Sequence, residues 1–206
     1  MLNFHKEPWP HYTGSLPDDF YNYVKENWNT NEEDKKWNKI KNRSNTFITD
    51  DKIITTLNEV ALDILHKSES VFKKYYPRLD ITKVKCSYSH TFSENPATDT
   101  GFPMRKLHID NGNKMVTGLW YFKNENEDED GGHLRLKNPI TREETQFFYR
   151  ENRIILFPNT PISWHYITKR EPSKYSRRFV CTMVEAKIKL HNYQTIKGED
   201  ITCLLY

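Results

Sequence analysis

The chain has 206 residues, of which 14% are aromatic and only 7 are glycine. A chain of this length buries roughly 70% of its unfolded surface in one core, and this composition excludes low-complexity and disordered classes. Lys and Arg number 31 against 28 Asp and Glu, and the net charge of +3 is spread without a basic block. We therefore expect one globular domain and do not expect nucleic acid as a partner.

Cysteine usage and hydropathy indicate a reducing, aqueous compartment. Cys86, Cys181 and Cys203 are odd in number and show no CxxC spacing, so a disulfide framework is not expected. The first residues carry charge, histidine and proline where a signal peptide would be apolar, and no run approaches the roughly 18 apolar residues of a membrane span. We expect a cytoplasmic protein with no membrane partner.

The first 78 residues are predicted to be a helical support. Residues 16–28 place Phe20, Tyr23 and Val24 at helical spacing behind an acidic first turn. Residues 29–43 are polar and are interpreted as a surface loop. From residue 49 to Phe72, apolar residues recur at intervals of three and four, which predicts one long helix packed on a sheet.

After Pro77 the sequence becomes a series of short β-branched and aromatic runs separated by Gly, Pro, Asn and Asp. Helices followed by strands predict a β core with a helical buttress, and the number of runs fits a barrel or a sandwich. The predicted strands are residues 83–92, 105–109, 115–122, 132–136, 146–149, 153–157, 163–167 and 178–185. The charged run 123–130 is interpreted as a solvated loop, and 201–206 as one more candidate strand.

His108 and Asp110 are separated by one residue, so on an extended segment both side chains project to the same face. An imidazole and a carboxylate can then share one metal ion. A second histidine from a distant strand would complete the two-histidine, one-carboxylate ligand set of non-haem Fe(II). His165, which follows Asp110 by 55 residues (165 − 110), is the candidate.

Two further motifs lie between Asp110 and His165: GGHLRL at 131–136 and RIILFP at 153–158. The order HxD, GGxLxL, RxxxFP, His and Arg resembles the Fe(II)/2-oxoglutarate-dependent oxygenase superfamily, and within it the prolyl 4-hydroxylase-like branch. The resemblance spans about residues 83–185. It implies a mainly β fold with a double-stranded β-helix core of the jelly-roll, cupin-like kind, and Fe(II) binding by His108, Asp110 and His165.

The resemblance also implies a cation that pairs the far carboxylate of 2-oxoglutarate, at the start of the strand after the distal histidine. Arg177 and Arg178 are both available there, and strand alternation sends them to opposite faces. We predict Arg178, 13 residues after His165 (178 − 165), because the residues that follow it match the family pattern better. Arg177 is the alternative. Tyr121 is predicted to contact the same carboxylate through its hydroxyl.

By this resemblance, residues 1–206 form a single oxygenase domain, with helical support over 1–78, the β core over 79–189 and a tail over 190–206. The implied activity is hydroxylation of an unactivated C–H bond in a prolyl or other peptidyl residue, using Fe(II), 2-oxoglutarate and dioxygen, with ascorbate as reductant. The expected partner is a peptide, protein or small-molecule substrate.

Two other functions are alternatives to hydroxylation. Oxidative demethylation of nucleic acid occurs in the same superfamily, but its further arginine is missing from the residues that follow Arg178. A cupin-like module that binds a metal or ligand without turnover is the second alternative. The loops at residues 93–104 and 168–174 are predicted to select the substrate, and one sequence does not reveal which substrate that is.

Overall fold

A computed structural model describes residues 2–28, 35–38, 43–101, 105–123, 131–191 and 194–195. In this part of the chain the strands form two antiparallel sheets. The larger sheet has eight strands. In spatial order they are β1 (Asn3–His5), β2 (His11–Gly14), β10 (Ile154–Pro158), β7 (Lys114–Tyr121), β12 (Arg177–Ala186), β5 (Cys86–Asn95), β4 (Arg43–Phe47) and β3 (Lys36–Asn38).

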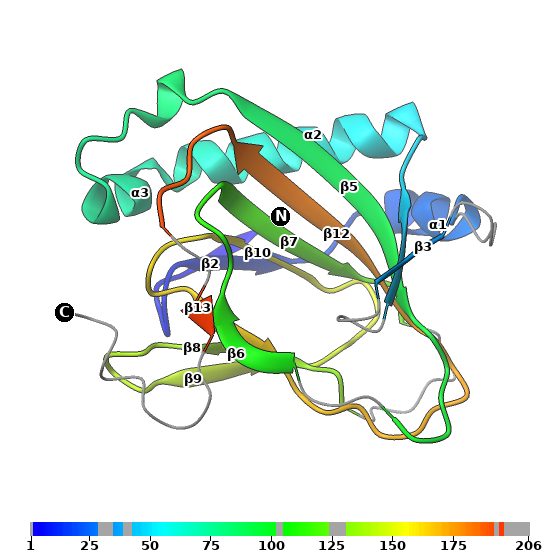
Figure 1. The fold of residues 1–206 in the computed structure, drawn as a ribbon. Coiled ribbons are helices and arrows are strands. Elements are labelled where there is room, and N and C mark those ends of the chain that lie inside the picture. Colours follow the sequence, from blue (N-terminus) through cyan, green and yellow to red (C-terminus); the bar gives the residue numbers. More distant parts are fainter. Residues whose placement is uncertain are drawn as a thin grey trace.

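The smaller sheet lies opposite the larger one (Figure 1) and has five strands in the described residues. In spatial order they are β13 (Gln194–Thr195), β6 (Arg105–Ile109), β11 (Trp164–Ile167), β8 (Leu134–Lys137) and β9 (Glu144–Phe147). The chain crosses from one sheet to the other at each step from β5 to β8 and again from β9 to β12, while β8 and β9 are neighbours in the smaller sheet. The predicted double-stranded β-helix is thus confirmed, and each predicted core strand matches an observed strand to within three residues at either end.

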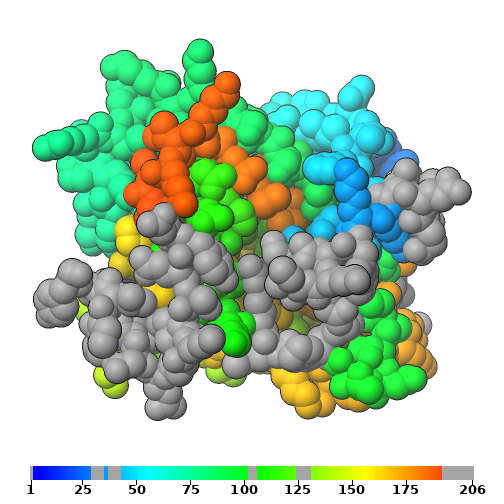
Figure 2. Space-filling model, viewed as in Figure 1, coloured from blue at the N-terminus to red at the C-terminus, as the bar shows by residue number. Residues whose placement is uncertain are grey.

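The helices α1 (Asp18–Glu26), α2 (Asp51–Lys67) and α3 (Glu69–Tyr75) cover the outer face of the larger sheet, and a short 3₁₀ helix, η2 (Ile81–Lys83), leads into β5. α2 begins where the Asp50 carboxylate accepts a hydrogen bond of 2.8 Å from the backbone N–H of Ile53. Its apolar stripe packs against β7, β10 and β12. The space-filling view from the same side shows cyan atoms along the upper right edge, beside green and orange ones (Figure 2).

The single long helix predicted through Phe72 is in fact two helices. Ser68 leaves the helical conformation, with φ −91° and ψ 5°, and ends α2 before α3 begins. Beyond the break, Val71 is buried, and Phe72 is buried in the core between the helices and the larger sheet. The apolar spacing continues across Ser68, so the sequence pattern does not reveal the change of direction.

The N-terminal region is also less purely helical than predicted, because it contributes β1, β2, β3 and β4 to the larger sheet. Residues 36–38 of the predicted surface loop form β3, while 29–34 and 39–42 lie outside the described residues. β3 and β4 are mostly polar strands at one margin of the sheet, where backbone pairing joins them to β5. The strand predicted at 201–206 and the charged loop at 124–130 also lie outside the described residues.

Two hydrophobic cores follow from this arrangement. One lies between the larger sheet and the helices, and includes Leu57, Ile64, Trp120 and Val180. The other lies between the two sheets and includes Leu119, Tyr121, Leu136, Phe157 and Phe179. Alternate residues of β7 and β12 therefore enter different cores, and the space between the sheets is called the interior below. None of the described helices is both long and apolar enough to span a bilayer.

Candidate metal centre and cosubstrate pocket

The predicted ligands His108, Asp110 and His165 come together in the interior. His108 lies on β6 and His165 on β11, and these two residues are direct register partners in the smaller sheet. Asp110 follows the end of β6. One ligand atom from each residue lies within 4.8 Å of the others, and all three side chains are buried. Two nitrogens and one carboxylate oxygen at this separation can converge on a single divalent cation.

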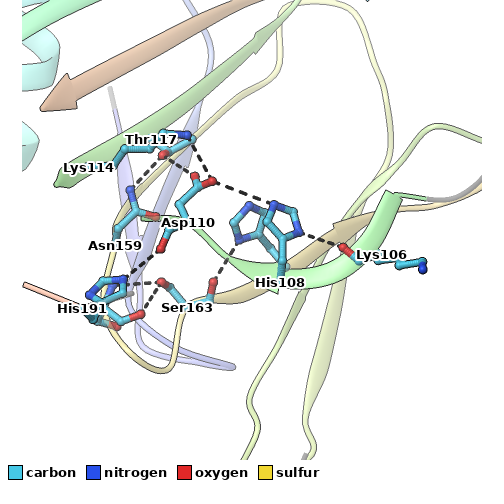
Figure 3. Close-up of polar contacts among 10 residues, drawn as sticks. Lys106, His108, Asp110, Lys114, Thr117, Asn159, Ser163 and His191 are labelled. Carbon is cyan, nitrogen blue, oxygen red and sulfur yellow. Dashed lines mark hydrogen bonds and ion pairs between the residues drawn. The ribbon is translucent and has the colours of Figure 1, made fainter. Parts of the chain in front are cut away.

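Backbone carbonyls orient both imidazole rings. Nδ1 of His108 lies 2.8 Å from the carbonyl oxygen of Lys106 (Figure 3), and Nδ1 of His165 lies 3.0 Å from that of Ser163. A carbonyl accepts a hydrogen bond only from a protonated nitrogen, so each ring carries its proton on Nδ1 and keeps Nε2 basic. Metal-binding histidines are commonly oriented in this way. The donor set therefore fits Fe(II).

The Asp110 carboxylate is held at both oxygens. Nζ of Lys114 lies 3.1 Å from Oδ1, and the Thr117 hydroxyl donates a hydrogen bond of 3.2 Å to Oδ2. Asn159 in turn donates a hydrogen bond of 2.8 Å to the Thr117 hydroxyl (Figure 3). Oδ1 is also the oxygen that faces His108, at 4.0 Å from Nε2. These contacts compensate for burying the carboxylate charge and fix the direction of its oxygens.

The backbone of Asp110 has a separate support. His191 lies beyond the β core, and its Nε2 is 3.0 Å from the Asp110 carbonyl oxygen, while its Nδ1 is 2.6 Å from the Tyr76 hydroxyl. Tyr76 ends α3, so this contact ties the helical layer to a candidate metal ligand. Burial lowers the pKa of His191. Sequence reasoning did not single out Lys114, Asn159 or His191. Of these three residues, only Lys114 carried a signal in the sequence, since it is a cation four residues after Asp110.

A buried guanidinium, that of Arg177, lies in the interior on β12. Its central carbon is 5.0 Å from the ring centroids of Tyr121 and Tyr149 and 4.7 Å from that of Phe179. Nη1 donates a hydrogen bond of 3.4 Å to Oδ1 of Asn95. Nε and Nη2 have no hydrogen-bond partner among the described residues, although both are shielded from solvent.

Tyr121 is where the sequence predicted it, facing inward. Its hydroxyl is buried and accepts or donates no well-formed hydrogen bond within the described part of the chain. Burial raises the pKa of Tyr121, and the adjacent Arg177 guanidinium partly opposes that rise. Two guanidinium nitrogens and a phenol hydroxyl, all buried and without hydrogen-bond partners among the described residues, form a site suited to an anion.

The structure does not bring Arg178 to Tyr121, so the prediction that these two residues lie together is wrong. Arg178 points to the opposite face of β12, where its Nε lies 3.1 Å from Oε1 of Glu94 and its guanidinium lies over the ring of Trp28. The predicted alternation along the strand is correct. The predicted face was wrong because β12 is largely buried on both sides. Its pattern of polar and apolar residues therefore does not show which side chains face the interior.

Gly131 and Gly132 shape the wall behind Arg177. Both have positive φ, +86° and +68°, which glycine adopts without strain. A Cβ at Gly132 would lie 3.0 Å from Cδ of Arg177 and 3.1 Å from its Nε. A Cβ at Gly131 would lie 1.9 Å from the carbonyl oxygen of Lys169. The GG pair of the sequence motif therefore lets the chain pass close to the buried guanidinium.

Residues 98–183 match the family model of the 2OG-Fe(II) oxygenase superfamily, a segment that includes all three metal-ligand candidates and Arg177. This chain contains a 2OG-Fe(II) oxygenase domain. The sequence-based resemblance to this superfamily is thereby confirmed, and so is the enzyme class that it implied. No curated protein sequence matches this oxygenase.

Several solved structures share the fold of this oxygenase. A prolyl-4-hydroxylase from Pseudomonas putida aligns with a TM-score of 0.63 at 13% identity, over 86% of this chain and 93% of that one. A Trichoplax adhaerens prolyl hydroxylase, in complex with a peptide fragment of hypoxia inducible factor, aligns with a TM-score of 0.51 at 15% identity, over 81% of this chain and 75% of the other.

A third structure, an oxidoreductase of the 2OG-Fe(II) oxygenase family from Burkholderia pseudomallei, aligns with a TM-score of 0.51 at 11% identity. The alignment covers 91% of this chain and 88% of that one. At these identities the likeness concerns the fold. The alignments extend well beyond residues 98–183, so the N-terminal helices and strands belong to the shared architecture.

Proposed function

We propose that this oxygenase hydroxylates an unactivated C–H bond of a prolyl or other peptidyl residue, with Fe(II) held by His108, Asp110 and His165. The observation that carries the proposal is the convergence of these three buried side chains in the interior that also contains Arg177. Three protein ligands leave room on an octahedral ion for cosubstrate and dioxygen. Bound Fe(II) supplies the oxygen-activating chemistry, and the protein supplies geometry and a dry pocket.

Arg177, and not Arg178, is proposed to pair the far carboxylate of 2-oxoglutarate. Its Nε and Nη2 are the buried donors without partners in the described residues, and a planar guanidinium can present two parallel N–H groups to a carboxylate. The Tyr121 hydroxyl lies beside it and can donate a further hydrogen bond. Tyr149 and Phe179 close the sides of the pocket and exclude water from the ion pair.

Two of the structures with this fold are prolyl hydroxylases, and one of them is in complex with a peptide. This likeness supports the proposal of a peptidyl substrate. Lys114 and Thr117 are assigned a positioning role, since both contact the Asp110 carboxylate and hold its oxygens toward the histidines.

The test is a turnover assay with Fe(II), 2-oxoglutarate and ascorbate, the last as the external reductant that keeps the metal ferrous. Succinate should form, and its rate should rise with an accepted proline-containing peptide. His108→Ala and Asp110→Ala should each lower the rate by about 1,000-fold or more, because two protein ligands do not retain the ion well. Iron content measured after desalting should fall in parallel.

Two outcomes would count against the proposal. Succinate formation at the wild-type rate in Asp110→Ala would remove the metal assignment. Tight 2-oxoglutarate binding without any decarboxylation, with or without peptides, would instead identify a cupin-like binding module. His133→Ala serves as the matched control, since His133 is buried in the same sheet region but its Nδ1 accepts a hydrogen bond of 3.1 Å from the backbone N–H of Tyr149.

A further inference from the structure

A second guanidinium, that of Arg43 on β4, faces the same interior as Arg177. Strand register establishes this. Asn45 pairs with Ser93 on β5, and Ser93 pairs with Phe179 on β12. Paired residues in antiparallel strands share a face, so these three side chains form one row on the interior face. The Asn45 amide oxygen accepts a hydrogen bond of 2.8 Å from the Ser93 hydroxyl, which agrees with this placement.

The adjacent row on the same face is Arg43, Asn95 and Arg177, since each residue is two positions along its strand from the row above. Asn95 pairs directly with Arg177 and accepts the hydrogen bond from its Nη1. The central carbon of Arg43 lies 5.5 Å from the ring centroid of Phe179, the ring that Arg177 also contacts. Arg43 and Arg177 thus flank one aromatic side chain.

Like Arg177, Arg43 has a buried guanidinium nitrogen without a hydrogen-bond partner among the described residues. This nitrogen is Nε, and no ion pair to Arg43 occurs within those residues. Glu94, one residue before Asn95, lies on the other face of β5, where it pairs with Arg178 and Lys35. Arg43 as a whole is half-buried, and burying part of a guanidinium without a partner costs free energy that an anionic ligand can recover.

The position of Arg43 separates it from the 2-oxoglutarate pocket. β5 lies between β4 and β12, so the backbones of Arg43 and Arg177 are about 10 Å apart at the usual strand spacing. Arg177 is enclosed on the Tyr121 and Tyr149 side, whereas Arg43 lies on the other side, toward the margin of the sheet. 2-oxoglutarate is a small dianion, and if the metal and Arg177 hold it, it does not also supply an anionic partner for Arg43.

We propose that Arg43 binds a carboxylate of the substrate, so that the enzyme prefers a substrate with an anionic group close to the carbon that it hydroxylates. This inference rests on the proposed function. The carboxylate can belong to an acidic side chain beside a proline in a peptide, or to a free amino acid. Arg43 is then a specificity-determining residue, with the Asn95 amide next to it as a neutral hydrogen-bonding group.

The test measures equilibrium binding by calorimetry to the anaerobic Fe(II)–2-oxoglutarate complex of the full chain. Two pairs of probes are compared, and the two members of each pair are of similar shape but differ in charge. The first is a capped pentapeptide with glutamate on each side of a central proline, against its glutamine counterpart. The second is L-proline against L-prolinamide. In the wild type the acidic member of at least one pair should bind about tenfold more tightly, the usual value of one charge-assisted hydrogen bond.

Arg43→Gln should abolish that preference, and Arg43→Lys should restore part of it, because lysine keeps the charge but not the planar fork. Arg78→Gln, at an exposed position beyond α3, is the matched control and should keep the full preference. Binding of 2-oxoglutarate is measured first on every variant and should be unchanged by Arg43→Gln.

A preference that survives Arg43→Gln, equal binding of both members of each pair by the wild type, or no binding of any probe would overturn the inference. The inference would also be overturned if Arg43→Gln raised the 2-oxoglutarate requirement by as large a factor as it weakened binding of the acidic probe. Failure of the proposed function looks different, since the wild type would then show neither 2-oxoglutarate binding nor succinate formation.

Discussion

The two faces of β12 bury polar side chains in different ways. On the helix-packed face, Arg178 pairs with Glu94, and the Thr182 hydroxyl lies 3.0 Å from both Nδ1 of His90 and Nε1 of Trp120. On the interior face, Arg177 keeps two nitrogens without partners among the described residues. The first face is satisfied by the protein itself, whereas the second is proposed to be completed by a ligand. Hydrogen-bond accounting therefore separates supporting residues from binding residues, even when they are neighbours in sequence.

Substitutions of the two arginines should produce the largest difference between the faces, in the requirement for 2-oxoglutarate. Arg177→Gln should raise the 2-oxoglutarate concentration needed for half-maximal succinate formation by about 100-fold, because it removes two charge-assisted hydrogen bonds to a buried carboxylate. Arg178→Gln should leave that concentration unchanged. The measurement is a titration of initial rate against 2-oxoglutarate.

Stability provides the reciprocal control for this pair. The Arg178–Glu94 ion pair is partly exposed, with 34% and 12% of the two side chains accessible, so its loss should lower the free energy of unfolding by less than about 1 kcal/mol. Arg178 and Lys35 hold the pKa of Glu94 below its usual range against the opposing effect of burial. If Arg178→Gln, and not Arg177→Gln, raised the 2-oxoglutarate requirement, the two faces would have been assigned the wrong way round.

The next effect concerns the helix-packed face, where His90 also contacts Asn58 at 2.8 Å. Burial lowers the pKa of His90 from 6.5 to about 4, so between those values the unfolded chain binds a proton that the folded protein does not. The contribution of His90 to stability is complete above pH 6.5 and is lost as the pH falls toward 4. Acidification from pH 7 to 5 should cost about 2 kcal/mol at this residue.

Urea denaturation at both pH values measures this loss. His90→Gln should reduce the pH dependence by about that amount, whereas His66→Gln, at an exposed position on α2, should retain the wild-type dependence. An unchanged pH dependence in His90→Gln would mean that the buried histidine is not neutral in the folded protein. Because His90 lies on the supporting face, neither substitution should alter the 2-oxoglutarate requirement.

The smallest effect concerns the hydroxyl of Tyr121. Tyr121→Phe keeps the ring against Arg177 and removes one neutral hydrogen-bond donor, which should raise the 2-oxoglutarate requirement by about three- to tenfold. Thermal stability should be retained, since the hydroxyl has no well-formed partner in the described residues. Equal 2-oxoglutarate requirements for Tyr121→Phe and the wild type would place the carboxylate away from β7.

The metal end of the interior could be predicted because its geometry is local. His108 and Asp110 share a face by alternation alone, and His165 enters a strand whose beginning the sequence marks with Asn159 and Pro161. The inward direction of Tyr121 follows from the same alternation, once β7 is placed in the interior. These assignments need one strand at a time and no knowledge of pairing.

The cation end could not be predicted in the same way. Whether Arg177 or Arg178 faces the interior depends on the register of β12 against β7, where Phe179 pairs with Tyr121, and a shift of one residue would exchange them. The contact of Arg43 with Phe179 depends on β4 joining the sheet beside β5, although β4 is too polar to be recognised as a strand. Pairing between distant segments, rather than side-chain chemistry, decided both positions.

The cross-strand pairing of His108 with His165 also has a consequence for assembly of the domain. These residues are 57 positions apart in the chain (165 − 108) and directly opposite in space. If β6 slipped by one residue, Leu107 or Ile109 would replace the imidazole and the two rings would no longer converge. An ion that requires both nitrogens would bind only the native register. Iron binding would therefore stabilise the correct pairing of β6 with β11 relative to a shifted one.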